Sequence, residues 1–141
     1  MSEQNVELHR RFVAAFNAGD PERFIALSDP QIEFHSVFAA VGGEIYHGHE
    51  GIRTWLSDFE DAWGGDIRLE PEAYFDLGEH TLAFQVLHGR GLQSGVEVAM
   101  ATAHVVRWRD SLMVYLKVYV HREDALDEMG VSEGSLEPIA P

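Results

Sequence analysis

Apolar residues near the start of the chain recur at helical spacing. One stripe of a helix would carry Leu8, Phe12, Val13 and Phe16. Gly19 follows at a position where a left-handed residue can end a helix. Asp20-Pro21 then has the pattern of an N-cap followed by proline at the first helical position. We therefore expect one helix that ends before Gly19 and a second, short helix that begins at Pro21.

A third helical pattern lies between residues 52 and 63. Its apolar face consists of Ile52, Trp55, Leu56, Phe59 and Trp63. This face is broad enough to lie on a sheet, and the Gly64-Gly65 pair would end the helix. Upstream of this helix, residues 32–37 alternate between apolar and polar positions, which predicts a strand.

After Gly65 the period of the pattern changes to that of strands. Four are expected, at roughly 66–77, 80–91, 96–109 and 112–121, with turns at Gly78-Glu79, Gln93-Ser94-Gly95 and Asp110-Ser111. Pro71 predicts a sheet edge or a bulge, because proline cannot donate to a ladder. Residues 123–129 predict a last helical turn closed by Gly130, and residues 131–141 a loose tail. Helices followed by a sheet indicate one α+β domain over residues 1–141, with an ordered core at about 5–130.

The final strand is apolar on both faces. It alternates Leu112, Val114, Leu116, Val118 and Val120 with Met113, Tyr115, Lys117, Tyr119 and His121. The strand before it has a similar character. Because a sheet usually has an apolar second face covered, we expect a homodimer packed through that face.

Composition narrows the possible partners. Ten Lys and Arg against 24 Asp and Glu give a formal net charge of −14, which would repel nucleic acid and anionic membranes. The chain has no cysteine, so disulfides, thiolate zinc sites, iron–sulfur clusters and a cysteine nucleophile are excluded. No secretory signal and no apolar run of membrane-spanning length is visible. A soluble, cytoplasmic protein without a cofactor is expected.

Three segments carry a resemblance to a known family. They are Asn17-Ala18-Gly19-Asp20, the stretch from Tyr46 to Arg53 with its Gly-x-x-Gly-Ile-Arg pattern, and Arg122-Glu123-Asp124-Ala125-Leu126. From about Asn5 to Gly130 the chain resembles the nuclear transport factor 2-like superfamily, and within it the SnoaL-like family. The resemblance implies a cone-shaped, strongly curved mixed or antiparallel sheet wrapped around three helices of the N-terminal half, with a cavity between them and usually a dimer. Relatives include steroid isomerases, polyketide cyclases, dehydratases, epoxide hydrolases and transport factors, so the fold does not name a reaction.

The catalytic groups of the steroid isomerases do not carry over to this chain. Their tyrosine would fall at Phe12, their strand acid at or beside Ala103, and their proton-shuttling acid at or beside Phe34. The acids of the epoxide hydrolases have no counterpart, because Ala101 and Ala103 occupy that stretch. A register shifted by one residue would instead place His35 and His104 at the two strand positions, and this alternative stays open.

Histidine can take and give a proton near neutral pH, so His35 and His104 are the candidate catalytic residues, with His35 the preferred base. For His104 the alternative is a structural histidine on the dimer face. His47-x-His49 beside Glu50 lacks a third ligand at regular spacing, and no metal site is expected there.

Small side chains on the strand before the last one favour a cavity. Ala99, Ala101 and Ala103 share one of its faces, opposite the aromatic residues of the helices. We expect an apolar cavity of roughly 300–1,000 Å³. Its expected ligand-binding residues are Phe12, Phe16, Tyr46, Trp55, Phe59, Ala101, Ala103, Val118 and Val120.

Two hypotheses for the function follow from this cavity. The first is a SnoaL-like protein that holds a hydrophobic small molecule and performs cofactor-free proton transfer, as in a cyclase, isomerase or dehydratase. The second is a binding or dimeric interaction module without catalysis, which the apolar residues at the isomerase positions favour.

Overall fold

The computed structural model describes residues 2–36, 45–63, 67–90 and 95–141. The elements in chain order are α1 (Ser2–Asn17), α2 (Pro21–Ala26), β1 (Ser28–His35), β2 (Tyr46–His47), α4 (Gly48–Trp63), β3 (Ile67–Leu77), β4 (His80–Arg90), β5 (Glu97–Arg109), β6 (Leu112–Tyr119), α5 (Arg122–Met129) and the 3-10 turn η1 (Glu133–Ser135). The predicted α+β class is confirmed, and each predicted helix and strand is present within a few residues of its expected bounds. The predicted turn at Gln93-Ser94 and the helix stop at Gly64-Gly65 lie outside the described residues.

The six strands form one open, mixed sheet in the order β2-β1-β6-β5-β4-β3. All neighbours are antiparallel except β1 and β6, which run parallel. Pro71 lies on the edge strand β3, and the pairing of β3 with β4 shifts register between Pro71 and Ala73, as its sequence predicts. The pairing of β5 with β6 shifts between Arg107 and Trp108.

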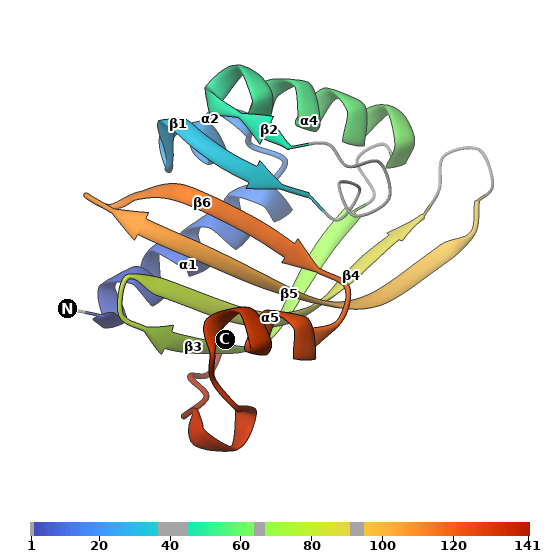
Figure 1. Cartoon of the computed structure of the whole chain (residues 1–141). Helices are drawn as coiled ribbons and strands as arrows, with labels where there is room; N and C mark the ends of the chain where they lie inside the picture. The colour runs from blue at the N-terminus through green and yellow to red at the C-terminus, as the bar shows by residue number, and fades with distance from the viewer. Residues whose placement is uncertain (1, 37–44, 64–66, 91–94) are drawn as a thin grey trace.

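Helices cover the two faces of this sheet unequally. We name the face that packs against α1, α2 and α4 the inner face, and the opposite one the outer face. In Figure 1, α1 crosses behind the sheet and α5 lies in front of it. The main core lies between the inner face and the three helices, and its members include Phe12, Phe24, Ile32, Phe34, Ile52, Trp55, Phe59, Trp108, Met113 and Leu116.

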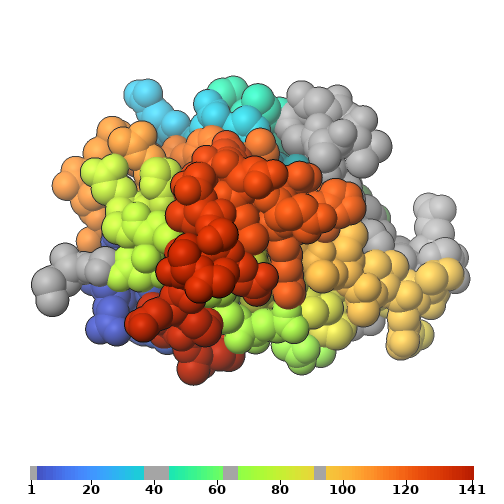
Figure 2. Space-filling view, turned by 60° about the horizontal axis from the view of Figure 1, so that its bottom comes forward, coloured from blue at the N-terminus to red at the C-terminus, as the bar shows by residue number. Residues whose placement is uncertain are grey.

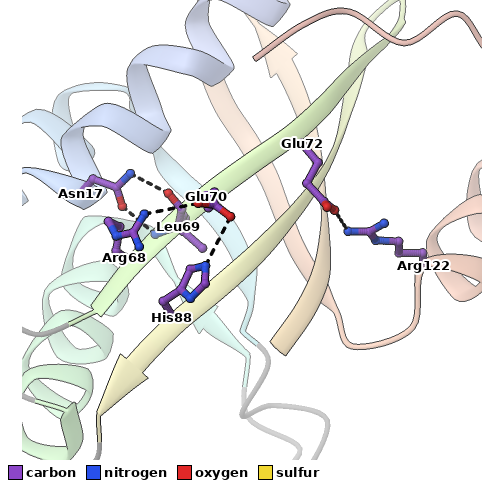
Figure 3. Close-up of polar contacts among 7 residues, drawn as sticks. All are labelled: Asn17, Arg68, Leu69, Glu70, Glu72, His88 and Arg122. Atoms are coloured by element: carbon purple, nitrogen blue, oxygen red, sulfur yellow. Dashed lines mark hydrogen bonds and ion pairs between the residues drawn. The ribbon is translucent and has the colours of Figure 1, made fainter. Parts of the chain in front are cut away.

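Polar side chains fasten the helix ends to the sheet. Asn17, at the end of α1, donates to the carbonyl of Leu69 at 2.9 Å and accepts from its N–H at 2.8 Å, as Figure 3 shows. Asp20 caps α2, because its Oδ1 accepts from the N–H of Arg23 at 3.2 Å. The segment Asn17–Asp20 therefore ends one helix, begins the next and anchors β3.

The turn into α4 depends on Gly48. Its φ of 68° lies in the left-handed region, and a Cβ there would approach the carbonyl oxygen of Pro30 to 2.8 Å. We expect Gly48→Ala to lower the unfolding free energy by about 2 kcal/mol, through backbone strain and this steric overlap.

Urea unfolding of the purified variant measures this effect. Gly19→Ala is the matched control, because Gly19 has a φ of 64° but open space at its Cβ position. It should show the strain alone, a loss of about 1 kcal/mol. Equal losses in the two variants would contradict the role of the Pro30 contact.

The outer face is covered in part by the chain's own C-terminal segment. Figure 2 shows α5 and the residues after it, in red, lying across the sheet. A second core cluster forms there from Phe75, Leu82, Phe84, Ala103, Val105, Tyr119 and Ala125. Arg122 ties α5 to β3 through an ion pair with Glu72 (Figure 3), and its guanidinium lies 4.7 Å from the ring centroid of Phe84. Part of the apolar second face that suggested a dimer is thus buried within one chain.

Most of residues 131–141 are exposed, but the tail that was expected to be loose is attached to the sheet near its end. Ile139 exchanges two backbone hydrogen bonds with Tyr74, at 2.9 Å and 2.7 Å. Its side chain packs against Val6, Tyr74 and Ala83, and Arg10 donates to the carbonyl of Ala140 at 2.7 Å. The free backbone groups of the edge strand β3 provide these partners, and local sequence contains no sign of them.

Among the described residues, no helix combines the length and the apolar character that crossing a membrane requires.

Candidate functional site

A cavity lies between the inner face of the sheet and the three helices. Its volume is about 40 Å³. Its lining is apolar apart from Thr102, His104 and the indole nitrogen of Trp55. We call it the inner cavity; its lining residues are Phe12, Phe16, Phe24, Phe34, Trp55, Phe59, Leu69, Leu87, Thr102, His104, Leu116 and Val118.

This volume corrects the expected range of roughly 300–1,000 Å³. Aromatic rings fill the space between helices and sheet. Trp55 lies 4.9 Å from Phe34 and 4.6 Å from Phe59 between ring centroids, and Phe12 lies 4.9 Å from Phe24. Forty cubic ångströms is room for a few water-sized groups, so a larger ligand requires these rings to move.

A wider pocket of about 260 Å³ lies next to the inner cavity, between the end of α1, the start of α2 and α4. Three phenylalanines, Phe16, Phe24 and Phe59, line both spaces. We call this space the mouth pocket. Its lining also contains two acidic residues, Asp20 and Glu60. The mouth pocket and the inner cavity therefore adjoin at these three aromatic side chains.

Polar groups without protein partners gather on the floor of the inner cavity. The Oγ1 of Thr102 and the Nδ1 of His104 are buried and lack a hydrogen-bond partner among the described residues. Gln85 pairs with Thr102 across β4 and β5, and its amide oxygen and nitrogen are likewise buried and unpartnered. Thr102 and His104 are among the residues that line the inner cavity, whereas Gln85 lies next to Thr102 and outside that lining. We name these three residues the polar floor. Buried polar groups in proteins normally have a partner, so water or a ligand would be bound here, and the inner cavity is the candidate site.

A second buried histidine, His9 of α1, lies beside this floor. The ring centroids of His9 and His104 are 6.3 Å apart and the rings are almost parallel, at 7°. The indole N–H of Trp108 donates to Thr81 Oγ1 at 2.9 Å, and Thr81 Oγ1 lies 2.7 Å from His9 Nδ1. The Thr81 hydroxyl therefore joins Trp108 and His9 in one chain of hydrogen bonds.

Sequence reasoning missed His9, although a signal exists. Val6, His9 and Val13 lie at helical spacing, which places the imidazole inside the apolar stripe of α1. The structure buries all three side chains.

Burial keeps both histidines neutral. Desolvation lowers the pKa of His104 to about 3. Desolvation, with a smaller contribution from His104, holds the pKa of His9 well below its ordinary value. At neutral pH each ring therefore carries one N–H donor and one acceptor nitrogen and no charge.

His35, the preferred base, does not line the inner cavity. It pairs with Lys117 in the parallel ladder of β1 and β6, which places it on the outer face, whereas its neighbour Phe34 points inward. Its Nε2 lies 2.6 Å from Glu33 Oε2, and its ring lies 5.2 Å from that of Tyr115. The register ambiguity between Phe34 and His35 is thereby resolved against a cavity role for His35.

The other predicted site residues divide into two groups. The lining contains Phe12, Phe16, Trp55, Phe59, His104 and Val118, as expected. Ala101, Ala103, Tyr46 and Val120 are not in it. Ala103 packs against the outer-face cluster under α5, and Ala101 is exposed on that same face. The error arose because both faces of β5 are apolar, so alternation could not show which one meets the helices.

Tyr46 and Val120 lie outside the lining of the inner cavity for different reasons. Tyr46 packs at the edge of the main core, 6.1 Å from Phe34 between ring centroids. Val120 follows the last residue of β6 and is 39% exposed.

His47 in β2 and His49 in the first turn of α4 both lie outside the lining of the inner cavity. His49 Nε2 lies 2.8 Å from the carbonyl oxygen of Ser28, and His47 is exposed. Arg53 forms an ion pair with Glu22, 3.9 Å away, as its place in the first turns of a helix suggests. Within the described ranges, no three His, Asp or Glu side chains lie close enough to hold a metal ion.

The comparison with protein families agrees with this architecture. The model of the SnoaL-like domain matches residues 9–116, from the middle of α1 to the middle of β6. The chain belongs to the SnoaL-like domain family. None of the curated proteins compared with the SnoaL-like chain matches it.

Solved structures share the fold of this SnoaL-like protein at low sequence identity. An NTF2-like protein of unknown function from Burkholderia pseudomallei has a TM-score of 0.75 and 17% identity, covering 87% of this chain and 95% of its own. A protein of ketosteroid isomerase-like fold from Catenulispora acidiphila, in complex with trimethylamine, has a TM-score of 0.73 and 17% identity, with coverages of 89% and 94%. A protein from Xanthomonas campestris that is named as a proposed polyketide cyclase has a TM-score of 0.75 and 15% identity, covering 91% of this chain and 98% of its own. At these identities the likeness shows the fold alone.

Proposed function

We propose that this SnoaL-like protein binds a small hydrophobic molecule in the inner cavity and admits it through the mouth pocket. The observation that supports this is the set of orphaned polar atoms on the floor of an otherwise apolar cavity, above all His104 Nδ1 and Thr102 Oγ1. An apolar site with a few convergent polar groups is the usual form of a small-molecule site.

A pair of valines on the same strand provides the test. Val118 lines the inner cavity, whereas Val120 is exposed two residues further on. Val118→Phe should fill the cavity and weaken the binding of toluene, used as an apolar probe, by at least tenfold. Val120→Phe should leave the affinity within twofold. Titration followed by two-dimensional NMR measures both affinities and shows whether each variant is folded.

Undiminished toluene binding by a folded Val118→Phe variant would place the ligand outside the inner cavity. Native mass spectrometry of the protein as purified adds a second readout. A co-purified small molecule present in the wild type and absent from Val118→Phe would support the same site.

Catalysis by cofactor-free proton transfer is the second candidate, and His104 is the histidine that lines the cavity. A pKa of about 3 makes this imidazole a weak base at neutral pH, since general bases work best with a pKa near the operating pH. We therefore rank binding above catalysis. Exchange of the α-protons of cyclohexanone for deuterium in D₂O tests this ranking. If the protein exchanges them faster than buffer alone and the His104→Gln variant does not, the protein is a catalyst.

We also propose a homodimer through the part of the outer face that α5 leaves open. Val86, Ala99 and Ala101 lie there, on adjacent strands. Light scattering on the wild type and on Ala101→Glu measures the mass in solution. A wild-type dimer that becomes a monomer in the variant supports the proposal. A wild type that is monomeric at about 100 micromolar contradicts it.

A further inference from the structure

We propose that the polar floor selects an uncharged ligand that carries a carbonyl or hydroxyl oxygen, and that the site rejects anions. This inference rests on the proposed binding function and specifies the class of compound that the inner cavity takes.

The floor offers both donors and acceptors to one small region. Thr102 lines the inner cavity with a hydroxyl that serves as donor or acceptor, and the fully buried Gln85 beside it on β4 has two N–H donors and an acceptor oxygen. His104, also buried, adds one ring nitrogen without a partner. Opposite the floor, the buried indole N–H of Trp55 is another donor without a partner among the described residues. A carbonyl or hydroxyl oxygen is complementary to such a set, whereas a hydrocarbon would leave every one of these groups unpaired.

The inner cavity contains no charge that could compensate an ionised ligand. No Asp, Glu, Lys or Arg is among its lining residues in the described part of the chain. His104 and its neighbour His9 are the titratable groups of the region, and burial keeps both neutral. An ionised group placed here would lose its hydration and gain no counterion, which is strongly unfavourable.

The mouth pocket adds discrimination against negative charge. Asp20 and Glu60 line it, and none of its described lining residues is basic. The whole chain carries a formal net charge of −14. An anionic ligand would thus meet an unfavourable potential before it reaches the floor.

Three probes of similar size test the inference: toluene, benzyl alcohol and benzoate, titrated at pH 7 by two-dimensional NMR. Benzyl alcohol should bind at least as tightly as toluene, because the floor replaces the hydrogen bonds that its hydroxyl loses to water. Benzoate should bind at least tenfold more weakly than benzyl alcohol. In a purely apolar cavity the alcohol would be the weaker ligand, by roughly tenfold or more.

Two substitutions on β4 distinguish an effect of the polar floor on binding from a general effect of mutating this strand. Gln85→Met removes the amide from the floor with little change of shape, and Val86→Met places the same side chain on the opposite face of the strand. Gln85→Met should lower the affinity for benzyl alcohol about tenfold and leave the affinity for toluene within twofold of the wild type. Val86→Met should change neither affinity by more than twofold. A thermal melt of each variant confirms that it is folded.

The outcomes distinguish this inference from the proposed function. If toluene binds while the alcohol is tenfold weaker, if benzoate binds as well as the alcohol, or if Gln85→Met affects both neutral probes equally, the selection by the polar floor is wrong. If none of the three probes binds, the proposed function itself fails.

Discussion

Acidification from pH 7 to pH 4 should lower the unfolding free energy of this protein by about 3 kcal/mol through His104 alone. In the unfolded chain this histidine takes up a proton near pH 6.5, whereas in the folded protein burial lowers its pKa to about 3. The unfolded state therefore binds more protons between these two values, and stability falls with pH at about 1.4 kcal/mol per unit. The contribution is fully present above pH 6.5 and is lost as the pH approaches 3.

His9 acts in the same direction, because its pKa is also held below the ordinary value. Typical domains are stable by only about 5–15 kcal/mol, so the two histidines bring the midpoint of acid unfolding into an accessible range. Carboxylates contribute to acid unfolding as well. The comparison of variants at matched pH isolates the histidine contribution.

Urea unfolding at pH 7, 5.5 and 4 measures the effect. His104→Leu, which removes the titrating group, should lose about 3 kcal/mol less than the wild type over this interval. The control His47→Gln changes an exposed histidine and keeps both buried ones, so it should follow the wild type. Parallel pH profiles for wild type and His104→Leu would show that His104 does not titrate differently in the two states.

Enlarging Ala103 should destabilise the protein by about 3 kcal/mol. Ala103 has no exposed surface, pairs with Phe84 and Tyr119, and belongs to the cluster that α5 covers. Ala103→Leu inserts three carbon atoms into that contact, and overpacking of a filled core displaces side chains and backbone. We expect α5 to be pushed away from the sheet, with no gain in stability from a filled cavity.

Ala101→Leu is the matched control for this prediction. It makes the same change two residues earlier on the same face, where the residue is exposed. Its unfolding free energy should stay within about 0.5 kcal/mol of the wild type, in samples that light scattering shows to be monomeric. A stabilised Ala103→Leu variant would instead mean that open space lies beneath α5.

The regular elements could be predicted because their signals are local. The strand bounds at 80–91 and 96–109 agree within a residue or so with β4 and β5, since turn residues and period-two alternation are properties of neighbouring residues. Asp20 and Pro21 likewise predicted the start of α2, because an N-cap needs only the side chain and the backbone three residues on.

The site was predicted only in part. Phe12, Trp55 and Phe59 were placed correctly because helical periodicity gives each helix a single apolar face. Ala101 and Ala103 were misplaced because β5 alternates without a clearly polar side, whereas His35 lies with Glu33 on the polar side of β1 that the alternation of residues 32–37 already indicated. A one-residue change of register transfers every side chain of a strand to the opposite face.

The sequence by itself determined the order of helices and strands, the α+β class and the aromatic faces of the helices. The tertiary structure alone decided which face of β5 meets the helices, the juxtaposition of His9 with His104, and the pairing of Ile139 with Tyr74. The last two contacts each join residues more than 60 positions apart. Local periodicity specifies a residue's own element and face, but the neighbours across the core depend on how all the elements pack at once.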